Sequence, residues 1–194
     1  AWLFAKIKTR NYHMMGIRYL GFHGIVKTVF KMLEWITCLV STSVECVSQS
    51  NLQMCIHEKL FSQNKGTVVW NGSTGGIDIE RFNVIKRNSY RKKTRENLHI
   101  GESEFVFGFV GRITKDKGIE ELVRAFLKLN RKAKLLLIGE IEESNHLSPD
   151  VLDDLKSVPD IILYPFVTDI EKYYAAIDCL VLPSYREGFG NVVM

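Results

Sequence analysis

Apolar residues along the chain form two patterns, short continuous runs and repeats at three- and four-residue steps, which follow one another closely. The run at 105–110 is apolar on both faces, which is typical of a central strand in a parallel sheet. Further strands are predicted at 134–138, 161–164 and 179–182, and helices at 119–129, 149–158 and 170–176. Strands that alternate with helices at this spacing predict a parallel α/β sheet.

The amino-terminal part, from residue 9 to 60, has the order strand, helix, strand, helix. A helix is predicted at 28–39, and we expect the apolar residues that recur there at helical spacing to face inward. These residues are Val26, Val29, Phe30, Leu33, Ile36 and Val40, with Lys27, Lys31 and Glu34 on the opposite face. Short strands are predicted at 43–48 and 67–70, and Ser50 suits the N-cap of a helix that ends at Glu58.

Two α/β domains joined by a crossing are expected. Residues 1–70 are assigned to the first domain, 71–104 to the crossing and 105–194 to the second domain. The crossing begins with glycines at 72, 75 and 76, and it contains six Lys or Arg between 86 and 95. Because no aromatic ladder or known binding motif accompanies these cations, we favour a solvated linker or helix face over a nucleic-acid site.

Composition sets broad limits. The 194 residues are 46% hydrophobic and 25% charged, as in ordinary globular proteins, and the net charge of +4 would suit an anionic partner without requiring one. Four widely spaced cysteines indicate reduced thiols rather than disulfides or a metal site. No stretch reaches the ~18 apolar residues of a membrane span, and the start shows no signal-peptide pattern, so we expect a cytoplasmic protein.

The strand order of the second domain predicts where a ligand would bind. In a doubly wound sheet of order 3-2-1-4, the first and fourth strands are neighbours, and ligands bind beyond their carboxyl ends. The loops at 111–118 and 183–191 are therefore expected to face each other across one crevice.

The first loop has the parts needed to hold a diphosphate. Gly111 allows a tight turn, Arg112 can fork onto phosphate oxygens and Lys117 adds a point charge. Gly118 opens a helix whose free amides favour negative charge. In the second loop, the Glu187 carboxylate can accept hydrogen bonds from hydroxyl groups, as a sugar would require. Read alone, the first loop could equally be a solvated turn.

The motifs Gly-Arg-x-x-x-x-Lys-Gly at 111–118 and Pro-Ser-x-x-Glu-Gly-Phe-Gly-Asn at 183–191 resemble the donor-binding domain of retaining GT-B glycosyltransferases. The resemblance is to family 4 in particular, the glycosyl transferases group 1, and it extends to the crossing at 71–82. It implies a GT-B fold with parts of two Rossmann-like doubly wound domains, acceptor-side first and donor-binding second. It also implies transfer of a hexose from a nucleoside diphosphate sugar to a glycan or lipid-linked acceptor, with retention and without a metal or other cofactor.

The resemblance also implies roles for residues. Arg112 and Lys117 would bind the diphosphate and stabilise the leaving group, and Glu187 would bind the sugar hydroxyls. These three are the candidate catalytic residues. The donor pocket would be formed by Gly111, Arg112, Lys117, Phe166, Val167, Glu187, Gly188, Phe189, Gly190 and Asn191, with Phe166 and Val167 at the nucleobase.

Two positions depart from the family pattern. The second glutamate of the family would stand at position 195, after the last residue, so we expect a truncated fragment that is inactive alone. Many family members have a His directly before a strand-ending glycine, whereas Met15 precedes Gly16 here and His13 lies further back. We interpret His13 as an ordinary packed or capped imidazole.

Other functional classes of protein are also consistent with these sequence features. A non-catalytic protein that binds nucleotide sugars or polysaccharides, a GT-B sugar epimerase and a phosphorylase would share these features. The apolar stretch at 22–40, flanked by Arg18, Lys27 and Lys31, suits either packing over a sheet or contact with an anionic bilayer. We favour packing, and peripheral contact at the inner face of a membrane stays open.

Overall fold

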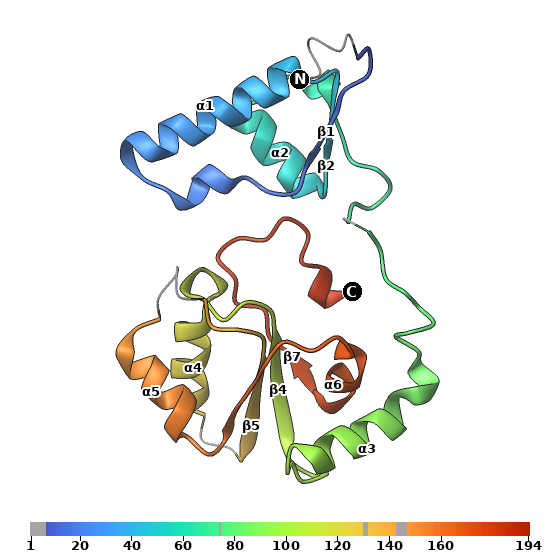
Figure 1. Cartoon of the computed structure of the whole chain (residues 1–194), viewed down its shortest axis with the longest axis vertical. Coiled ribbons are helices and arrows are strands. Elements are labelled where there is room, and N and C mark those ends of the chain that lie inside the picture. The colour runs from blue at the N-terminus through green and yellow to red at the C-terminus, as the bar shows by residue number, and fades with distance from the viewer. Residues whose placement is uncertain (1–6, 74, 130–131, 143–146) are drawn as a thin grey trace. The chain divides into compact units, whose positions relative to one another are not determined.

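A computed structural model describes the chain except for residues 1–6, 74, 130–131 and 143–146 (Figure 1). The chain divides into two compact units. The first unit consists of Ala1–Gly76 with Glu187–Asn191, and the second of Ile77–Arg186 with Val192–Met194. In the described part of the chain, no helix has both the length and the apolar character needed to cross a membrane.

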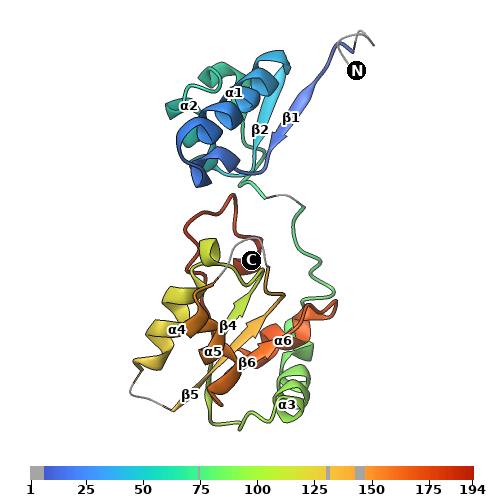
Figure 2. The same cartoon turned by 60° about the vertical axis from the view of Figure 1, so that its left-hand side comes forward.

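The first unit contains a parallel sheet of order β1-β2-β3, formed by β1 (Asn11–Met14), β2 (Ser43–Cys46) and β3 (Gly66–Thr67). α1 (Gly24–Val40) and α2 (Gln49–His57) connect the strands and lie on the same face of the sheet (Figure 2). The N-cap of α2 is Ser48, whose hydroxyl accepts a hydrogen bond from Asn51 N–H, so the prediction of Ser50 was wrong. β3 is also shorter than the predicted strand at 67–70.

The orientation of α1 contradicts the sequence-based expectation. Phe30 packs partly buried against the core, as predicted, and Cys38 is buried. Val26, Val29, Leu33 and Ile36 are exposed. Lys31 and Glu34 of this helix instead face the rest of the unit. Lys31 forms an ion pair with Glu58, and Glu34 accepts a hydrogen bond from the Tyr12 hydroxyl. Apolar residues occur on nearly every side of α1, so their spacing does not identify the inward face.

The second unit contains a parallel sheet of order β6-β5-β4-β7, which confirms the predicted order 3-2-1-4. Its strands are β4 (Phe105–Val110), β5 (Ala133–Ile138), β6 (Ile161–Tyr164) and β7 (Cys179–Leu180). In the described part of the chain β7 pairs only with β4, and Cys179 is exposed. The continuous apolar run at 179–182 indicates a buried strand, but the strand is shorter than that run and its first residue is exposed, so this expectation was wrong.

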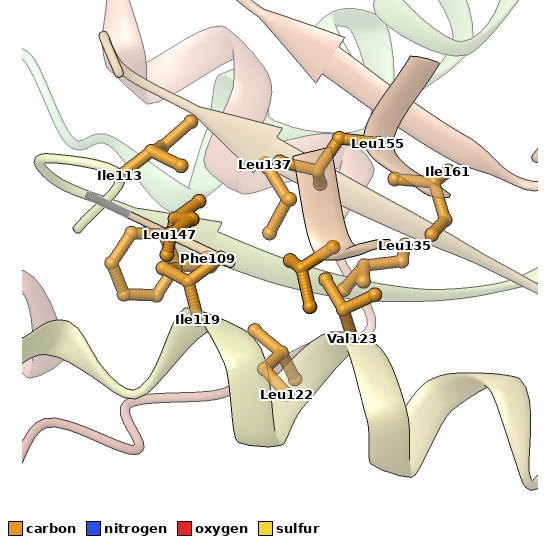
Figure 3. Packing of buried hydrophobic residues seen from close by; sticks show 11 residues of the cluster. Phe109, Ile113, Ile119, Leu122, Val123, Leu135, Leu137, Leu147, Leu155 and Ile161 are labelled. Atoms are coloured by element: carbon orange, nitrogen blue, oxygen red, sulfur yellow. The ribbon is translucent and has the colours of Figure 1, made fainter. Parts of the chain in front are cut away.

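Side chains of alternating strand residues pack into two separate hydrophobic cores, one on each face of the sheet. Leu135 and Leu137 of β5 face α4 (Ile119–Leu127) and α5 (Pro149–Ser157), where Figure 3 shows the packing. Leu136 and Ile138 face the other side, which is covered by α6 (Ile170–Ala176) and the segment after α3 (Arg87–Asn97). Helices on both faces explain why the strands are apolar throughout.

The basic run at 86–95 forms a helix with a solvated face, as expected, because Lys86, Arg87, Lys92 and Lys93 are exposed. Arg95 is the exception among these cations. Arg95 is 1% exposed and donates hydrogen bonds to the carbonyls of Gly101, Glu102, Glu104 and Ala176. It also forms an ion pair of 2.7 Å with Asp178. A guanidinium group with five donors can be buried only where acceptors surround it in this way.

Candidate functional site

The loop between β4 and α4 needs glycine at both ends. Gly111 has φ +147° and Gly118 has φ +71°, backbone conformations that other residues rarely adopt. A Cβ atom on Gly118 would lie 2.3 Å from the carbonyl oxygen of Pro183. Gly118 is also the N-cap residue of α4, so the first amides of that helix open onto this loop.

Arg112 lies on this loop and is exposed. Its Nη1 atom is 2.7 Å from the Glu142 carboxylate, and the two side chains are 57% and 40% exposed. Phosphate and carboxylate oxygens accept hydrogen bonds from the same guanidinium donors. Glu142 therefore occupies a donor that a phosphate could use. This competition could not be predicted from the sequence, because it depends on how the two loops pack.

The loops after β4 and β7 lie side by side at the carboxyl ends of neighbouring parallel strands. Tyr185 N–H donates a hydrogen bond of 3.1 Å to the carbonyl of Asp116, and its hydroxyl donates one of 2.6 Å to Glu121. Together with the close approach of Gly118 to Pro183, these bonds confirm the predicted adjacency for residues 183–185 of the second loop. The second loop leads directly to Glu187 in the chain.

Ser184, within the second loop, was given no role from sequence. Its hydroxyl is buried and has no hydrogen-bond partner among the described residues. Such a group costs about 1–3 kcal/mol if nothing satisfies it, so a ligand or water is expected to bind it. An unsatisfied hydroxyl becomes visible only once the surrounding packing is known.

The glycine-rich segment Glu187–Asn191 is part of the first unit. Ser48 Oγ donates a hydrogen bond of 2.8 Å to the carbonyl of Gly188, and a Cβ on Gly188 would lie 2.1 Å from the Met15 carbonyl. Gly188 is therefore required for this close approach, and Gly190 has φ +72°. Ser48 and Met15 are contacts of the predicted sugar-binding segment that the motif alone does not indicate.

The other candidate residues lie apart from these contacts. Phe166 and Val167 follow β6, two strands from β4 at the same edge of the sheet, and Phe166 is 70% exposed while Val167 packs in the core. His13 pairs across the sheet with Glu45 at 3.4 Å and is 39% exposed. This pairing gives His13 an ordinary structural contact. The four cysteines are free thiols, of which Cys38, Cys46 and Cys55 are buried and Cys179 is exposed.

Relatives with known names match the chain. The sequence profile of the family described as glycosyl transferases group 1 matches residues 104–194. The capsular polysaccharide biosynthesis glycosyltransferase CapM of Staphylococcus aureus is 34% identical over 186 residues, covering 94% of this chain and 48% of the relative. The UDP-Gal:alpha-D-GlcNAc-diphosphoundecaprenol alpha-1,3-galactosyltransferase of Escherichia coli is 27% identical, covering 87% and 43%. The chain thus spans about half the length of these curated relatives.

Solved structures match both units. HepE of Anabaena, in complex with UDP and glucose, has a TM-score of 0.80 at 20% identity, covering 99% of this chain and 50% of that one. The chain has the GT-B fold. WaaG, a glycosyltransferase involved in lipopolysaccharide biosynthesis, matches this GT-B chain with a TM-score of 0.75 at 14% identity, covering 99% and 57%. The profile and the named relatives support a GT-B glycosyltransferase, and they do not favour a binding protein or an epimerase.

Proposed function

We propose that the protein containing this chain transfers a hexose from a nucleoside diphosphate sugar to a glycan or lipid-linked acceptor, with retention and without a metal. The observation that carries this proposal is the adjacency of the loops after β4 and β7. One loop bears Arg112 and Lys117, and the other leads to Glu187 and the glycines that follow it.

The cations would act on the leaving group. The bond between the anomeric carbon and the diphosphate oxygen breaks, so negative charge grows on the diphosphate. That charge would be stabilised most strongly in the transition state by three groups: the Arg112 guanidinium, the Lys117 ammonium and the amino-terminal end of α4. This neutralisation is the task that a divalent metal performs in other transferases.

The acceptor hydroxyl oxygen forms the new bond to the anomeric carbon, on the face from which the diphosphate leaves. Its proton passes to the departing phosphate oxygen, so no separate general base is needed. In this proposal the Glu187 carboxylate holds the hydroxyls of the donor sugar. The backbone of Gly188, Phe189, Gly190 and Asn191 lines the sugar pocket, and Phe166 with Val167 meets the nucleobase.

The relatives support the donor class and the hexose. HepE was solved with UDP and glucose and also with UDP-glucose, and the relative of Escherichia coli is named as a galactosyltransferase that uses UDP-Gal. That name also contains a diphosphoundecaprenol acceptor, and CapM is named for capsular polysaccharide biosynthesis. These names support a glycan or lipid-linked acceptor for this chain.

The test is donor-dependent sugar transfer by the full-length protein, measured with a panel of labelled nucleotide sugars. Arg112→Ala should lower kcat/KM by about a hundredfold or more, because it removes charge stabilisation of the leaving group. Arg124→Ala is the matched control, since Arg124 is an exposed arginine on α4 outside the loop. Unchanged kcat/KM in Arg112→Ala would refute the assignment, and donor binding without turnover in the parent would favour a binding protein.

A further inference from the structure

Ser48 connects the Glu187–Asn191 segment to the sheet and helices of the first unit. Its hydroxyl donates a hydrogen bond of 2.8 Å to the Gly188 carbonyl, which lies 140 residues further along the chain. The same oxygen accepts a hydrogen bond of 3.1 Å from Asn51 N–H, because Ser48 is the N-cap of α2. Ser48 lies between β2 and α2, so both elements fix its position.

The hydrogen bonds of the Ser48 hydroxyl have defined directions. A serine hydroxyl has one hydrogen to donate and two lone pairs that accept. A carbonyl oxygen can only accept, so the hydrogen of Ser48 goes to Gly188. The lone pairs then accept from Asn51 N–H and from the Ser50 hydroxyl, whose oxygen is 3.1 Å away. A replacement for Ser48 must therefore supply both a donor and an acceptor.

Close contacts hold Gly188 within reach of Ser48. A Cβ atom on Gly188 would clash with the Met15 carbonyl oxygen and would lie 3.3 Å from the Val47 side chain. Val47 is fully buried, and its carbonyl accepts a hydrogen bond of 2.8 Å from Ser73 N–H. These contacts restrict the position of Gly188, and the bond from Ser48 fixes the direction of its carbonyl.

The direction of the Gly188 carbonyl determines the direction of the next amide. In a trans peptide the carbonyl and the following N–H lie in one plane and point to opposite sides. Because the described residues contain no cis peptide, Phe189 N–H points away from Ser48. Among the described residues, none accepts a hydrogen bond from Phe189 N–H. This amide is therefore a donor that a ligand could use.

We propose that Ser48 is a positioning residue for donor binding, which orients the peptide between Gly188 and Phe189 so that its N–H meets the donor sugar. This inference rests on the proposed function, which assigns the Glu187–Asn191 segment to that sugar. With its carbonyl held by Ser48, the peptide presents its donor, and not its acceptor, to a sugar hydroxyl. An amide that is already oriented binds more tightly, because less freedom is lost on binding.

Substitutions of Ser48 in the full-length protein separate this role from helix capping. Ser48→Asp keeps an acceptor for the cap but has no hydrogen for the Gly188 carbonyl at neutral pH, whereas Ser48→Thr keeps both. Ser62→Ala is the matched control, since the exposed Ser62 hydroxyl of the same unit bonds Asn64. Calorimetry measures the binding of UDP-glucose and of UDP, which lacks the sugar.

Ser48→Asp should raise the Kd for UDP-glucose about fivefold or more and leave the Kd for UDP unchanged, with a Tm near that of the wild type. Ser48→Thr and Ser62→Ala should bind both ligands as the wild type does. An unchanged Kd for UDP-glucose in Ser48→Asp, or equal weakening of both ligands, would overturn the inference.

The result for Ser48 and the result for the proposed function can be told apart. Sugar transfer by the wild type, with an unchanged Kd for UDP-glucose in Ser48→Asp, would refute the role of Ser48 and leave the proposed function standing. A wild type that shows the expected difference in binding but transfers no sugar would count against the proposed transfer alone. A wild type that binds neither ligand would overturn both.

Discussion

The hydroxyl of Tyr185 donates a hydrogen bond of 2.6 Å to the carboxylate of Glu121, joining the loop after β7 to the first turn of α4. This bond raises the pKa of the Tyr185 hydroxyl and lowers the pKa of Glu121. The backbone N–H of Tyr185 adds a second bond, to Asp116. Tyr185 therefore holds the loop after β7 against the loop after β4 and the first turn of α4.

Tyr185→Phe removes the hydroxyl and keeps the backbone bond. We expect the KM for the donor to rise about threefold in the full-length protein with little change in Tm, because one exposed hydrogen bond is lost. Tyr90→Phe, on α3, is the control and should leave the KM unchanged. An unaltered KM in Tyr185→Phe would mean that the backbone contacts alone position the loop.

Gly118→Ala tests the close approach of the two loops. The new Cβ would meet the Pro183 carbonyl at 2.3 Å, and the residue would have to keep φ +71°. We expect the free energy of unfolding to fall by about 1–3 kcal/mol, measured by urea denaturation. Gly75→Ala is the matched control, because its Cβ would meet nothing within 4 Å. Equal stability of both variants would contradict the observed packing.

The arrangement of these loops could be predicted because it follows from topology. Runs such as 105–110 identify strands, alternation with helices makes the sheet parallel, and winding then brings the ends of β4 and β7 together. Local sequence specifies each of these steps. The contact of Met15 and Ser48 with Gly188 could not be found in this way, because it joins segments far apart in the chain.

The sequence-based expectations that failed for α1 and for Arg95 failed for the same physical reason. The inward face of α1 depends on Tyr12 and Glu58, which bond its polar residues, and helical spacing contains no information about them. The burial of Arg95 depends on carbonyls near residues 101–104 and 176. Composition predicts that a basic run is solvated, and at Arg95 tertiary acceptors reverse that expectation.

Glu142→Gln tests the competition at Arg112. The wild-type carboxylate bonds Arg112 at 2.7 Å, and a neutral amide would hold the guanidinium less strongly. We expect the KM for the donor to fall about two- to fivefold, since an exposed ion pair is weak. Asp153→Asn on α5 removes a comparable exposed charge and serves as the control. A higher KM in Glu142→Gln would instead make Glu142 an aid to donor binding.

Arg95→Met tests the role of the buried guanidinium. The substitution removes the guanidinium donors to four carbonyls and one of the two arginine partners of Asp178. Removal of one partner of a buried pair costs about 3–5 kcal/mol. Urea denaturation of the chain should show this loss. Arg87→Met, at an exposed position of the same helix, should change the free energy of unfolding by less than about 0.5 kcal/mol. A small effect in both variants would contradict the contacts of Arg95.

Asp178 should make the second unit sensitive to acid. Burial acts to raise the pKa of this carboxyl, but the Val106 N–H and the guanidinium groups of Arg91 and Arg95 outweigh it, so the pKa lies below its ordinary value of 3.8. Between the lowered pKa and 3.8 the unfolded chain binds more protons, and stability therefore increases with pH in that window.

Asp178 therefore makes its full contribution to the free energy of unfolding at pH values above its ordinary pKa of 3.8. That contribution is lost as the pH falls through the lowered pKa of the folded state. Asp178→Asn should be less stable than the wild type at neutral pH, and the difference should shrink as the pH falls below 3.8. Urea denaturation of both proteins across this range measures the difference directly. A difference that stays constant with pH would show that the ionised form of Asp178 does not supply the stability.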